Sequence, residues 1–485
     1  MKLPKWATAL DVLAVVMAII AISVFVAGGF RLVFFDIRLS VTDWWRPALW
    51  SAIALVIRHA IIRRHPLPQR VALAIANWWR HPDTRVVLPI HLATRGGVLA
   101  VGFLAVILVG YPANSGAPPW RVYSNDFLDL PGRWDTGWYL GIANEGYQWN
   151  PTLGPEVQQN IAFFPAFPMT MRYLSAVLGH QPLWTGVGIS LVAFFLGLVY
   201  FLRLARDELG NEDSAAAAVA LLAAYPFALF FSAAYTEGLF FLTLVAAVSH
   251  FRKDQLWRSA AWGFACGLTR PNGCFLSVAL GLMALGPAWD AARWRPILHP
   301  TTQSPRGGGP SLPPAIGWGL LWARLASASA PGLGMIAFSF FIYRLTGNPL
   351  QWTTQNAAWG RVYRGLDTLV ADRVGFIATN GLYSYASTQT IDFFYLLAVL
   401  FALGAVWPVY RRFGLPYAAL ILVNVLPPVS VGGLLSMGRV TSVLFPAFLW
   451  MGAAVPARHR VAWVAFFACL QGFVAIMFFT WRPIY

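Results

Sequence analysis

The stretch ATALDVLAVVMAIIAISVFVAGGF, residues 7–30, decides the class of fold. It follows Lys2 and Lys5, and it is longer than the apolar core of a signal peptide. No small-residue cleavage site stands out within it. Because a helix needs about 20 apolar residues to cross a bilayer, we expect this stretch to form a retained first transmembrane helix.

Similar apolar runs recur along the whole chain. Of its 485 residues, 58% are hydrophobic and only 11% are charged, whereas a soluble domain carries about 25% charged residues. The composition therefore predicts an all-α polytopic membrane protein with about 11–13 transmembrane helices. Candidate spans lie near residues 8–30, 47–62, 96–112, 183–203, 214–232, 236–250, 259–269, 272–287, 319–343, 392–410, 416–432, 440–456 and 461–480. Because proline removes a helical donor, the short pair at 259–287 is expected to be a hairpin broken at Arg270-Pro271.

The surplus of basic residues sets the predicted orientation. The chain has 35 Lys and Arg residues against 19 Asp and Glu residues, and its net charge is +16. Basic residues of membrane proteins collect in cytoplasmic loops, and no compact tract of basic and aromatic residues indicates nucleic-acid binding. The segments predicted to be cytoplasmic are 63–95, 252–253, 293–324, 411–412 and 458–460. Residues 113–182 and about 346–390 are then large outer loops.

One apolar segment, residues 162–178, is not expected to span the membrane. If 113–160 lies outside and 251–258 inside, an odd number of crossings separates them, and the runs at 183–203, 214–232 and 236–250 already supply three. The segment contains Pro165, Pro168 and Arg172, which suit an interfacial or re-entrant helix packed on the protein.

These boundaries predict five regions. In order they are N-terminal spans with a basic cytoplasmic loop (1–112), a first outer loop (113–182), a transmembrane module (183–345), a second outer loop (346–391) and C-terminal helices (392–485). Residues 300–314 form a flexible loop rich in Pro, Gly and Ser, for which we expect no chemistry. The three cysteines all lie in apolar runs and give neither a disulfide framework nor a zinc site.

The densest group of polar and aromatic residues is RWDTGWY, residues 133–139. A carboxylate such as Asp135, just beyond a span, can act as a base that accepts a proton from an attacking hydroxyl. Arg133 is a candidate for binding substrate or phosphate, and Trp138 and Tyr139 could shape a sugar pocket. The alternative is structural: Asp135 caps a helix, and the aromatic rings belong to an interfacial belt.

Two further acidic or basic positions interrupt apolar stretches near the predicted outer face. Glu237, in SAAYTEG at 232–238, is a candidate because acidic residues near the membrane are often functional; the alternative is a first-turn residue favoured by the helix dipole. Arg270 and Asn272, in TRPNG at 269–273, are candidates because the planar fork of arginine pairs phosphate oxygens. The alternative for Arg270 is a side chain that snorkels from a helix end.

Arg439, in SMGR at 436–439, is a second candidate for binding phosphate, again with a snorkelling side chain as the alternative. Arg344, Arg361 and Arg364 of the second outer loop are weaker candidates. No metal ligands are predicted, because the histidines lack H-x-x-x-H spacing, and no P-loop, dinucleotide fingerprint or nucleophile elbow occurs. We therefore expect no nucleotide site and assign no cofactor; a divalent metal is not indicated.

Five motifs in order resemble the PIG-V family (GPI mannosyltransferase II and its bacterial relatives) of the GT-C glycosyltransferase superfamily. They are RWDTGWYLGIANEGY at 133–147, NIAFFPAFPMTMRYL at 160–174, FFSAAYTEGLFFLTL at 230–244, AAWGFACGLTRPNG at 260–273 and GRVTSVLFPAFLW at 438–450. Each motif alone is weak, but their order over roughly residues 130–450 is specific. Residues 1–112 lie outside the resemblance.

The resemblance implies a GT-C-type fold and a membrane glycosyltransferase (a mannosyltransferase) that uses a polyprenyl-phosphate-mannose donor at the outer or lumenal face. It implies that Asp135 is the catalytic base of an inverting displacement, and we place Arg270 and Arg439 beside the leaving phosphate by their positions. The acceptor is left open as a lipid, a glycan or a protein hydroxyl, and the donor sugar as mannose or another hexosyl or pentosyl group. The composition, rich in Ala, Arg and Trp, suggests a bacterial plasma membrane.

Two other classes of function remain open at this point. A transporter or lipid flippase usually shows repeated halves with helices broken at corresponding positions, whereas this sequence shows one break, at Arg270-Pro271, and no repeat. A non-catalytic assembly subunit would tolerate the loss of Asp135.

Overall fold

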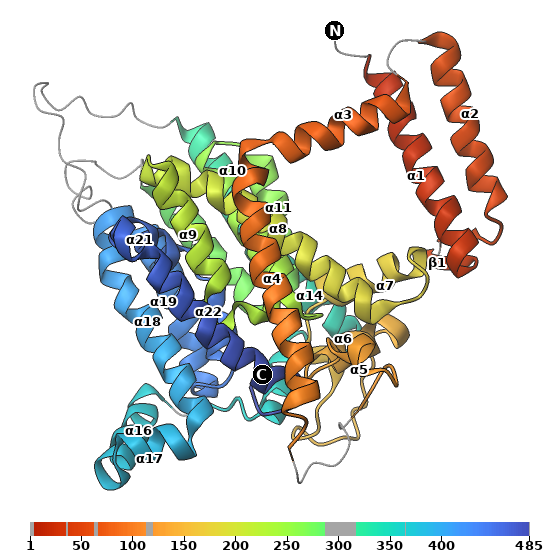
Figure 1. The fold of residues 1–485 in the computed structure, drawn as a ribbon. Helices are drawn as coiled ribbons and strands as arrows, with labels where there is room; N and C mark the ends of the chain where they lie inside the picture. Colours follow the sequence, from red (N-terminus) through yellow and green to blue (C-terminus); the bar gives the residue numbers. More distant parts are fainter. Residues whose placement is uncertain are drawn as a thin grey trace, which may run out of the picture.

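The computed structural model describes residues 4–34, 37–62, 66–112, 120–286, 317–363 and 365–484. Within these ranges the chain is helical apart from one short hairpin of strands (Figure 1). The predicted loop at 300–314 and Arg364 lie outside the described residues.

The N-terminal helices stand apart from the main bundle (Figure 1). They are α1 (Lys5–Ala27), α2 (Trp45–Ile61) and α3 (Leu67–Arg80), and α3 leads to the bundle. An antiparallel hairpin, β1 (Phe30–Phe34) and β2 (Ile37–Val41), joins α1 to α2. This hairpin is a small departure from the predicted all-α chain.

The main bundle holds most of the long apolar helices. They are α4 (Pro82–Leu108), α8 (Pro182–Leu209), α9 (Glu212–Ala224), α10 (Glu237–Arg252), α11 (Leu256–Thr269), α12 (Leu276–Leu285), α14 (Trp318–Thr346), α18 (Thr390–Phe413), α19 (Leu415–Gly432), α21 (Phe445–Ala454) and α22 (Ala457–Phe479). Short elements link them: the 3₁₀ helices η2 (Pro226–Ser232) and η3 (Pro271–Phe275) and the helix α20 (Met437–Ser442). α9, η2 and α10 are almost wholly buried and form the centre.

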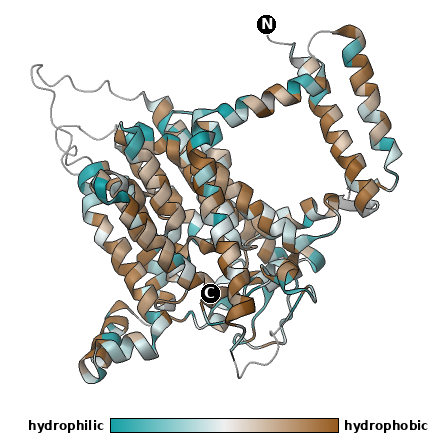
Figure 2. Ribbon diagram, viewed as in Figure 1, coloured by the Kyte–Doolittle hydropathy of each residue, from teal (hydrophilic) through white to brown (hydrophobic). Residues whose placement is uncertain are grey.

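Within the described residues, six helices are long and apolar enough to cross a bilayer, or up to seven if α9 and η2 count as one bent span. Shorter apolar helices lie at Pro271–Leu285, Leu415–Val431 and Phe445–Ala454. Figure 2 shows apolar residues along the middles of the bundle helices and hydrophilic residues gathered toward their ends. The chain is therefore an integral multi-pass membrane protein, as predicted; the predicted total of 11–13 also counts the shorter helices.

One end of the bundle is rich in paired charges. Ion pairs join α4 to α8, α8 to α10 and the turn after α10 to α14; they are Asp83–Arg203, Glu208–Arg252 and Asp254–Arg324. This is the end that the basic loops predict to be cytoplasmic.

The basic segment 63–95, predicted to be a loop, is mostly helical where it is described. α3 fills residues 67–80, and α4 already begins at Pro82, so the predicted span at 96–112 starts too late. Arg95 is therefore buried inside the bundle, where it donates hydrogen bonds to the carbonyl oxygens of Ala223 (2.6 Å) and Ala228. Those carbonyls lie at a 78° bend between α9 and η2, in a stretch predicted as one continuous span.

The two segments predicted to be outer loops form a cover of short helices at the other end of the bundle (Figure 1). The first contains α5 (Asp126–Asp129), α6 (Thr136–Glu145), η1 (Asn160–Ala162) and α7 (Ala166–Val177). At 12 residues, α7 is too short to span a bilayer, in agreement with the predicted non-spanning segment. The second contains α15 (Gln351–Thr354), η4 (Gln355–Trp359), α16 (Leu366–Asn380) and α17 (Leu382–Thr388).

Candidate active site

Four predicted residues from distant parts of the sequence meet at the covered end of the bundle. Asp135 immediately precedes α6, Glu237 is the first residue of α10, Arg270 follows α11, and Arg439 lies in α20. Each is therefore at the end of a helix or in a short one, where the chain turns. The structure thus gathers one residue from each of four predicted motifs into one cluster.

Ion pairs connect the four side chains in a row. Arg439 bridges the two acids: its Nη1 lies 2.5 Å from Oδ2 of Asp135, and its Nε lies 2.6 Å from Oε1 of Glu237. Nη1 of Arg270 lies 2.5 Å from the same oxygen of Glu237. The alternative interpretation, that Arg270 and Arg439 snorkel from helix ends toward water, is therefore wrong, because both side chains point at a buried carboxylate.

The two acids of the cluster differ in their access to solvent. The side chain of Glu237 is 0% exposed, whereas that of Asp135 is 21% exposed. Asp135 occupies the N-cap position of α6, yet its side chain makes no capping hydrogen bond, so the capping alternative is also wrong. Glu237 serves as the inner anchor for two arginines, and Asp135 is the carboxylate that a ligand can reach.

Backbone strain lies on both sides of the Asp135–Arg439 pair. Trp134, directly before Asp135, has φ of +50°, and Ser436, three residues before Arg439, has φ of +60°. Non-glycine residues rarely adopt this left-handed conformation, and such strain concentrates at functional sites. The surrounding packing must therefore hold these two turns in place.

Tyr235 is the main packing residue beneath the cluster. Its hydroxyl accepts a hydrogen bond from the Asp135 backbone N–H (3.1 Å), and its ring lies 4.6 Å from the Arg439 guanidinium. Its carbonyl accepts a hydrogen bond from Ser190 Oγ on α8 (2.8 Å). α8 and α10 approach closely here, because a Cβ at Gly238 would lie only 2.5 Å from the Ser190 carbonyl oxygen. The tyrosine thus fixes the orientation of both the acid and the arginine.

Arg361, treated as a weak candidate from the sequence, lies beside the cluster. It is partly buried, and burial and the neighbouring cations Arg439 and Arg270 lower the pKa of Arg361 to about 10. In the part of the chain that the structure describes, its guanidinium makes no hydrogen bond or ion pair, unlike those of Arg270 and Arg439. From the sequence Arg361 is only a weak candidate, because it is one of three arginines of the second outer loop and does not interrupt an apolar stretch.

Aromatic side chains line the approach to Asp135. The Trp138 ring stacks on Phe163 (5.8 Å between centroids) and meets the edge of Trp359 (5.7 Å). Tyr139 points inward against Phe167, and burial raises the pKa of Tyr139 to about 12. Trp138 therefore belongs to the wall of the site, and Tyr139 to the packing behind it.

Two predicted site residues do not join the cluster. Arg133 is fully buried and donates hydrogen bonds to the carbonyl oxygens of Phe479 (2.8 Å) and Asp129 (2.9 Å). It ties the first outer loop to the C-terminal end of α22. Asn272 donates to Oδ1 of Asn424 (2.9 Å) and ties η3 to α19. Arg133 and Asn272 therefore stabilise the elements around the candidate site and do not face its solvent-accessible side.

A metal centre built from side chains is not evident in the described ranges. No group of three or more His, Cys, Asp and Glu residues there has the geometry of a metal site. The two acids of the cluster are engaged by arginines instead. The fold and the cluster together define a multi-pass membrane protein with one solvent-reachable carboxylate set among arginines at one end of its bundle.

Comparison with known proteins shows which family of membrane proteins the chain resembles. The family described as mannosyltransferase (PIG-V) matches residues 114–285, the range that contains Asp135, Glu237 and Arg270. The chain is 29% identical over 250 residues to GPI mannosyltransferase 2 of Drosophila pseudoobscura pseudoobscura, and the match covers 48% of this chain and 49% of the fly protein. The predicted resemblance to the PIG-V family is thereby confirmed, and the chain spans about half the length of this curated relative.

Solved structures give a weaker likeness. A crystal structure of the Archaeoglobus fulgidus oligosaccharyltransferase tethered with an acceptor peptide matches with a TM-score of 0.35 and 13% identity, over 84% of this chain and 56% of that one. A structure of AglB from the same organism, with an inhibitory peptide and a dolichol-phosphate, gives 0.32 and 14%, over 80% and 55%. Similarity of this size assigns neither fold nor ligand, so the GT-C-type fold stays a prediction.

Proposed function

We propose that this chain is a membrane glycosyltransferase that moves a mannosyl residue from a polyprenyl-phosphate-linked donor to an acceptor hydroxyl. The family match and the fly relative support transfer of mannose. The observation that carries the proposal is the position of Asp135: it is reachable from solvent, yet its carboxylate is held by an arginine that is itself anchored on a buried acid.

In the proposed reaction, Asp135 accepts the proton of the acceptor hydroxyl as that oxygen forms a bond to the anomeric carbon of the donor. The bond from the anomeric carbon to the phosphate oxygen breaks, and the electron pair leaves with the lipid phosphate. Attack from the face opposite the phosphate inverts the configuration. Arg439 holds one oxygen of Asp135, which fixes the direction in which the free oxygen can accept the proton.

The leaving phosphate gains negative charge as the bond breaks, so cations held beside it lower the barrier. Arg270 and Arg439 supply part of this field, but each is already paired with a carboxylate. Arg361 is the third arginine at the cluster and the one left without such a pair in the described structure, so we assign to it the direct contact with the phosphate. Arginine suits this contact because its planar fork matches phosphate oxygens.

An apolar groove supports a lipid-linked donor. It has a volume of about 550 Å³, and its lining comes mostly from α7 and the outer half of α8, with Leu242 from α10. Its apolar residues include Leu178, Ile189 and Val192. Since α10 begins at Glu237, the groove lies within two helical turns of the cluster and offers a place for the first units of the polyprenyl chain.

Charge supports an assignment of the membrane face. The cluster lies at the end of the bundle opposite the paired arginines of α8, α10 and α14, and the positive-inside rule favours a cytoplasmic location for that basic end. We therefore propose that transfer takes place on the outer or lumenal face. The bacterial plasma membrane suggested by composition finds no support in the comparison, since the curated relative comes from a fly.

The test uses purified protein in nanodiscs with radiolabelled polyprenyl-phosphate-mannose and a membrane extract as a mixed source of acceptors. We expect label to pass from the donor to an acceptor with inverted anomeric configuration, as read by NMR or by linkage-specific mannosidases. Retention of configuration would overturn the single-base mechanism. Transbilayer movement of intact donor without any transfer would instead favour the transporter class.

A further inference from the structure

The residues that follow α22 pack against the first outer loop. We call residues 480–484, which directly follow the end of α22, the post-α22 segment. The backbone N–H of Arg482 donates to the carbonyl oxygen of Met477 in α22 (2.9 Å). Nη1 of the same arginine donates to the carbonyl oxygen of Gly110, just beyond α4 (3.2 Å). The segment is therefore fixed to two helices of the bundle.

Trp481 is the residue of the post-α22 segment that meets the loop of the candidate base. Its side chain is buried, and its ring centroid lies 5.1 Å from that of Trp134 and 5.6 Å from that of Trp120. The guanidinium of Arg133 lies over the same ring at 5.4 Å. Trp481 thus contacts both residues that directly precede Asp135.

Both tryptophans of the Trp134–Trp481 contact have a strained backbone. The φ angle is +50° at Trp134 and +59° at Trp481. Non-glycine residues rarely adopt this left-handed conformation, and it persists only where the surrounding structure enforces it. Because the two rings pack against each other, each turn helps to hold the other in place.

The turn at Trp134 carries hydrogen bonds that orient the candidate base. The Asp135 backbone N–H donates to the hydroxyl of Tyr235 (3.1 Å), and the Thr136 N–H donates to the carbonyl oxygen of Arg133 (3.1 Å). These bonds set the point at which α6 begins. If the turn were released, the carboxylate of Asp135 would move relative to its arginine partner.

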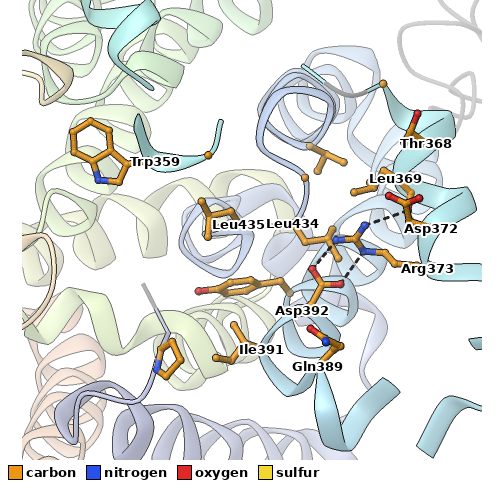
Figure 3. A pocket seen from close by; sticks show the side chains of 16 residues that line it. Trp359, Thr368, Leu369, Asp372, Arg373, Gln389, Ile391, Asp392, Leu434 and Leu435 are labelled. Carbon is orange, nitrogen blue, oxygen red and sulfur yellow. Dashed lines mark hydrogen bonds and ion pairs between the residues drawn. The ribbon is translucent and has the colours of Figure 1, made fainter. Parts of the chain in front are cut away.

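Beyond Trp481 the post-α22 segment borders a cavity of about 460 Å³ between η4, α16, α18 and the end of α19 (Figure 3). Pro483 lines this cavity, and Ile484 is fully buried in the main core. Figure 3 shows Arg373 of α16 facing Asp392 of α18 at the cavity, with N–O distances of 2.6 and 2.8 Å. The segment is therefore anchored after Trp481 as well as before it.

We propose that Trp481 is a positioning residue for the transfer reaction. It holds the turn at Trp134 in the conformation that directs Asp135 toward the acceptor hydroxyl, and it acts through Trp134 rather than on the reacting atoms. This inference rests on the proposed function. It adds a residue that lies outside the matched range 114–285 and after the last of the five motifs.

The test compares transfer by the wild type, Trp481→Ala and Trp481→Phe in the labelled donor assay, with rates normalised to monodisperse protein. The matched control is Trp352→Ala. Trp352 and Trp481 are each 7% exposed, and Trp352 packs on Phe164 (5.1 Å) in the same cover of short helices. Loss of Trp352 also removes a hydrogen bond to Ser339 (2.9 Å). The control should therefore lose at least as much packing and hydrogen bonding as Trp481→Ala.

We expect Trp481→Ala to lower kcat about 100-fold, because displacement of a catalytic group by about 1 Å has an effect of this size. The donor KM should stay within about twofold of wild type, since the phosphate site is kept. Trp481→Phe retains a ring against Trp134 and should stay within about fivefold of the wild-type kcat, and the control within about threefold. A wild-type kcat for Trp481→Ala, or equal losses in Trp481→Ala and the control, would overturn the inference.

Trp134→Ala tests the same contact from its half-buried side, and it decides the question even if Trp481→Ala does not fold. It should lower kcat to a similar extent. Addition of Trp481→Ala should cause little further loss, because residues that act through one contact have non-additive effects. A kcat near wild type for Trp134→Ala, or losses that multiply in the double variant, would show that Trp481 does not act through Trp134.

Hydrogen–deuterium exchange separates this inference from the proposed function, because it needs no turnover. Peptides that cover residues 133–139 should exchange faster in Trp481→Ala than in the wild type, and the control should match the wild type. Faster exchange, together with a wild type that transfers no label, would keep Trp481 as the residue that holds the turn and overturn the proposed function. Transfer by the wild type, with exchange and kcat unchanged in Trp481→Ala, would do the reverse.

Discussion

Two clusters of buried arginine and aspartate lie at different places in this chain and differ in what can reach them. In the N-terminal helices, Asp11 of α1 lies 3.1 Å from Arg58 of α2 and also pairs with Arg70 of α3; the Asp11 side chain is only 5% exposed. In the main bundle, Asp135 pairs with Arg439 but is 21% exposed. Both clusters fix helices to one another.

The difference shows that a buried ion pair is by itself weak support for a site. Taking charges out of water is costly, and a buried pair repays this cost only with good geometry. The Asp11 cluster fastens three helices and leaves no open carboxylate. In the Asp135 cluster, the fully buried Glu237 pairs with Arg270 and Arg439 and holds the helices together. Asp135 therefore stays available for a ligand.

The largest expected effect is a difference in transfer rate between the variants Asp135→Asn and Asp11→Asn. Asp135→Asn should lower transfer at least about 1,000-fold, because the base is lost while the shape is kept. Asp11→Asn should leave transfer within about threefold of wild type once the folded fraction is matched. Initial rates with labelled donor, normalised to monodisperse protein, check both. Equal losses in the two variants would remove the distinction between the clusters.

Glu237→Gln should lower the stability of the protein, because Glu237 is the shared partner of two arginines. It leaves Arg270 and Arg439 buried without their shared anchor, and breaking a buried pair typically costs about 3–5 kcal/mol. The midpoint temperature of thermal unfolding in detergent should fall strongly for Glu237→Gln and for Asp11→Asn, and far less for Asp135→Asn. A variant of Glu237 that keeps full stability would show that the inner acid is not the anchor.

Arg439→Lys should test whether geometry as well as charge matters within the Asp135 cluster. Lysine keeps the charge but cannot bridge Asp135 and Glu237 with two separate nitrogens, so transfer should fall about 100-fold. Arg344→Lys, at an exposed arginine of the same outer face, serves as the control and should match wild type. A rate near wild type for Arg439→Lys would mean that charge alone suffices.

The smallest effect is expected at the arginine without a carboxylate partner. Arg361→Ala should raise the donor KM about tenfold and change kcat by less than about threefold, if its contact to phosphate is made equally in the ground and transition states. Little loss of stability is expected, since no described ion pair breaks. A donor KM equal to that of wild type would remove Arg361 from the phosphate site.

Much of the fold could be predicted because span length and charge bias are local properties. The helices near 183–203, 319–343 and 461–480 lie close to their predicted positions as α8, α14 and α22. The break at Arg270-Pro271 was also predictable, since proline cannot continue the helix. The errors have two causes. α4 begins before residue 96 because Arg95 is buried and donates to backbone carbonyls at the bend between α9 and η2, a contact that no local pattern reports. The bend itself lies at Pro226, which cannot continue the helix, so it could have been predicted from the sequence.

The site was predictable in part for the same reason. Charged residues inside apolar stretches stand out, so Asp135, Glu237, Arg270 and Arg439 could be chosen from the sequence, and the structure brings them together. Arg133 stands out equally, yet it binds carbonyl oxygens of α5 and α22. The position of Arg361 beside the cluster depends on how the second outer loop folds against the bundle, which sequence spacing does not encode.

The most direct test is a cryo-electron microscopy structure of the Asp135→Asn protein with intact polyprenyl-phosphate-mannose in nanodiscs. The account predicts density for the phosphate between Arg361 and Arg439, with the mannosyl ring beside residue 135 and the lipid chain leaving along α7 and α8. Donor density elsewhere in the bundle, or a mannosyl ring remote from residue 135, would contradict the assignment of this cluster as the active site.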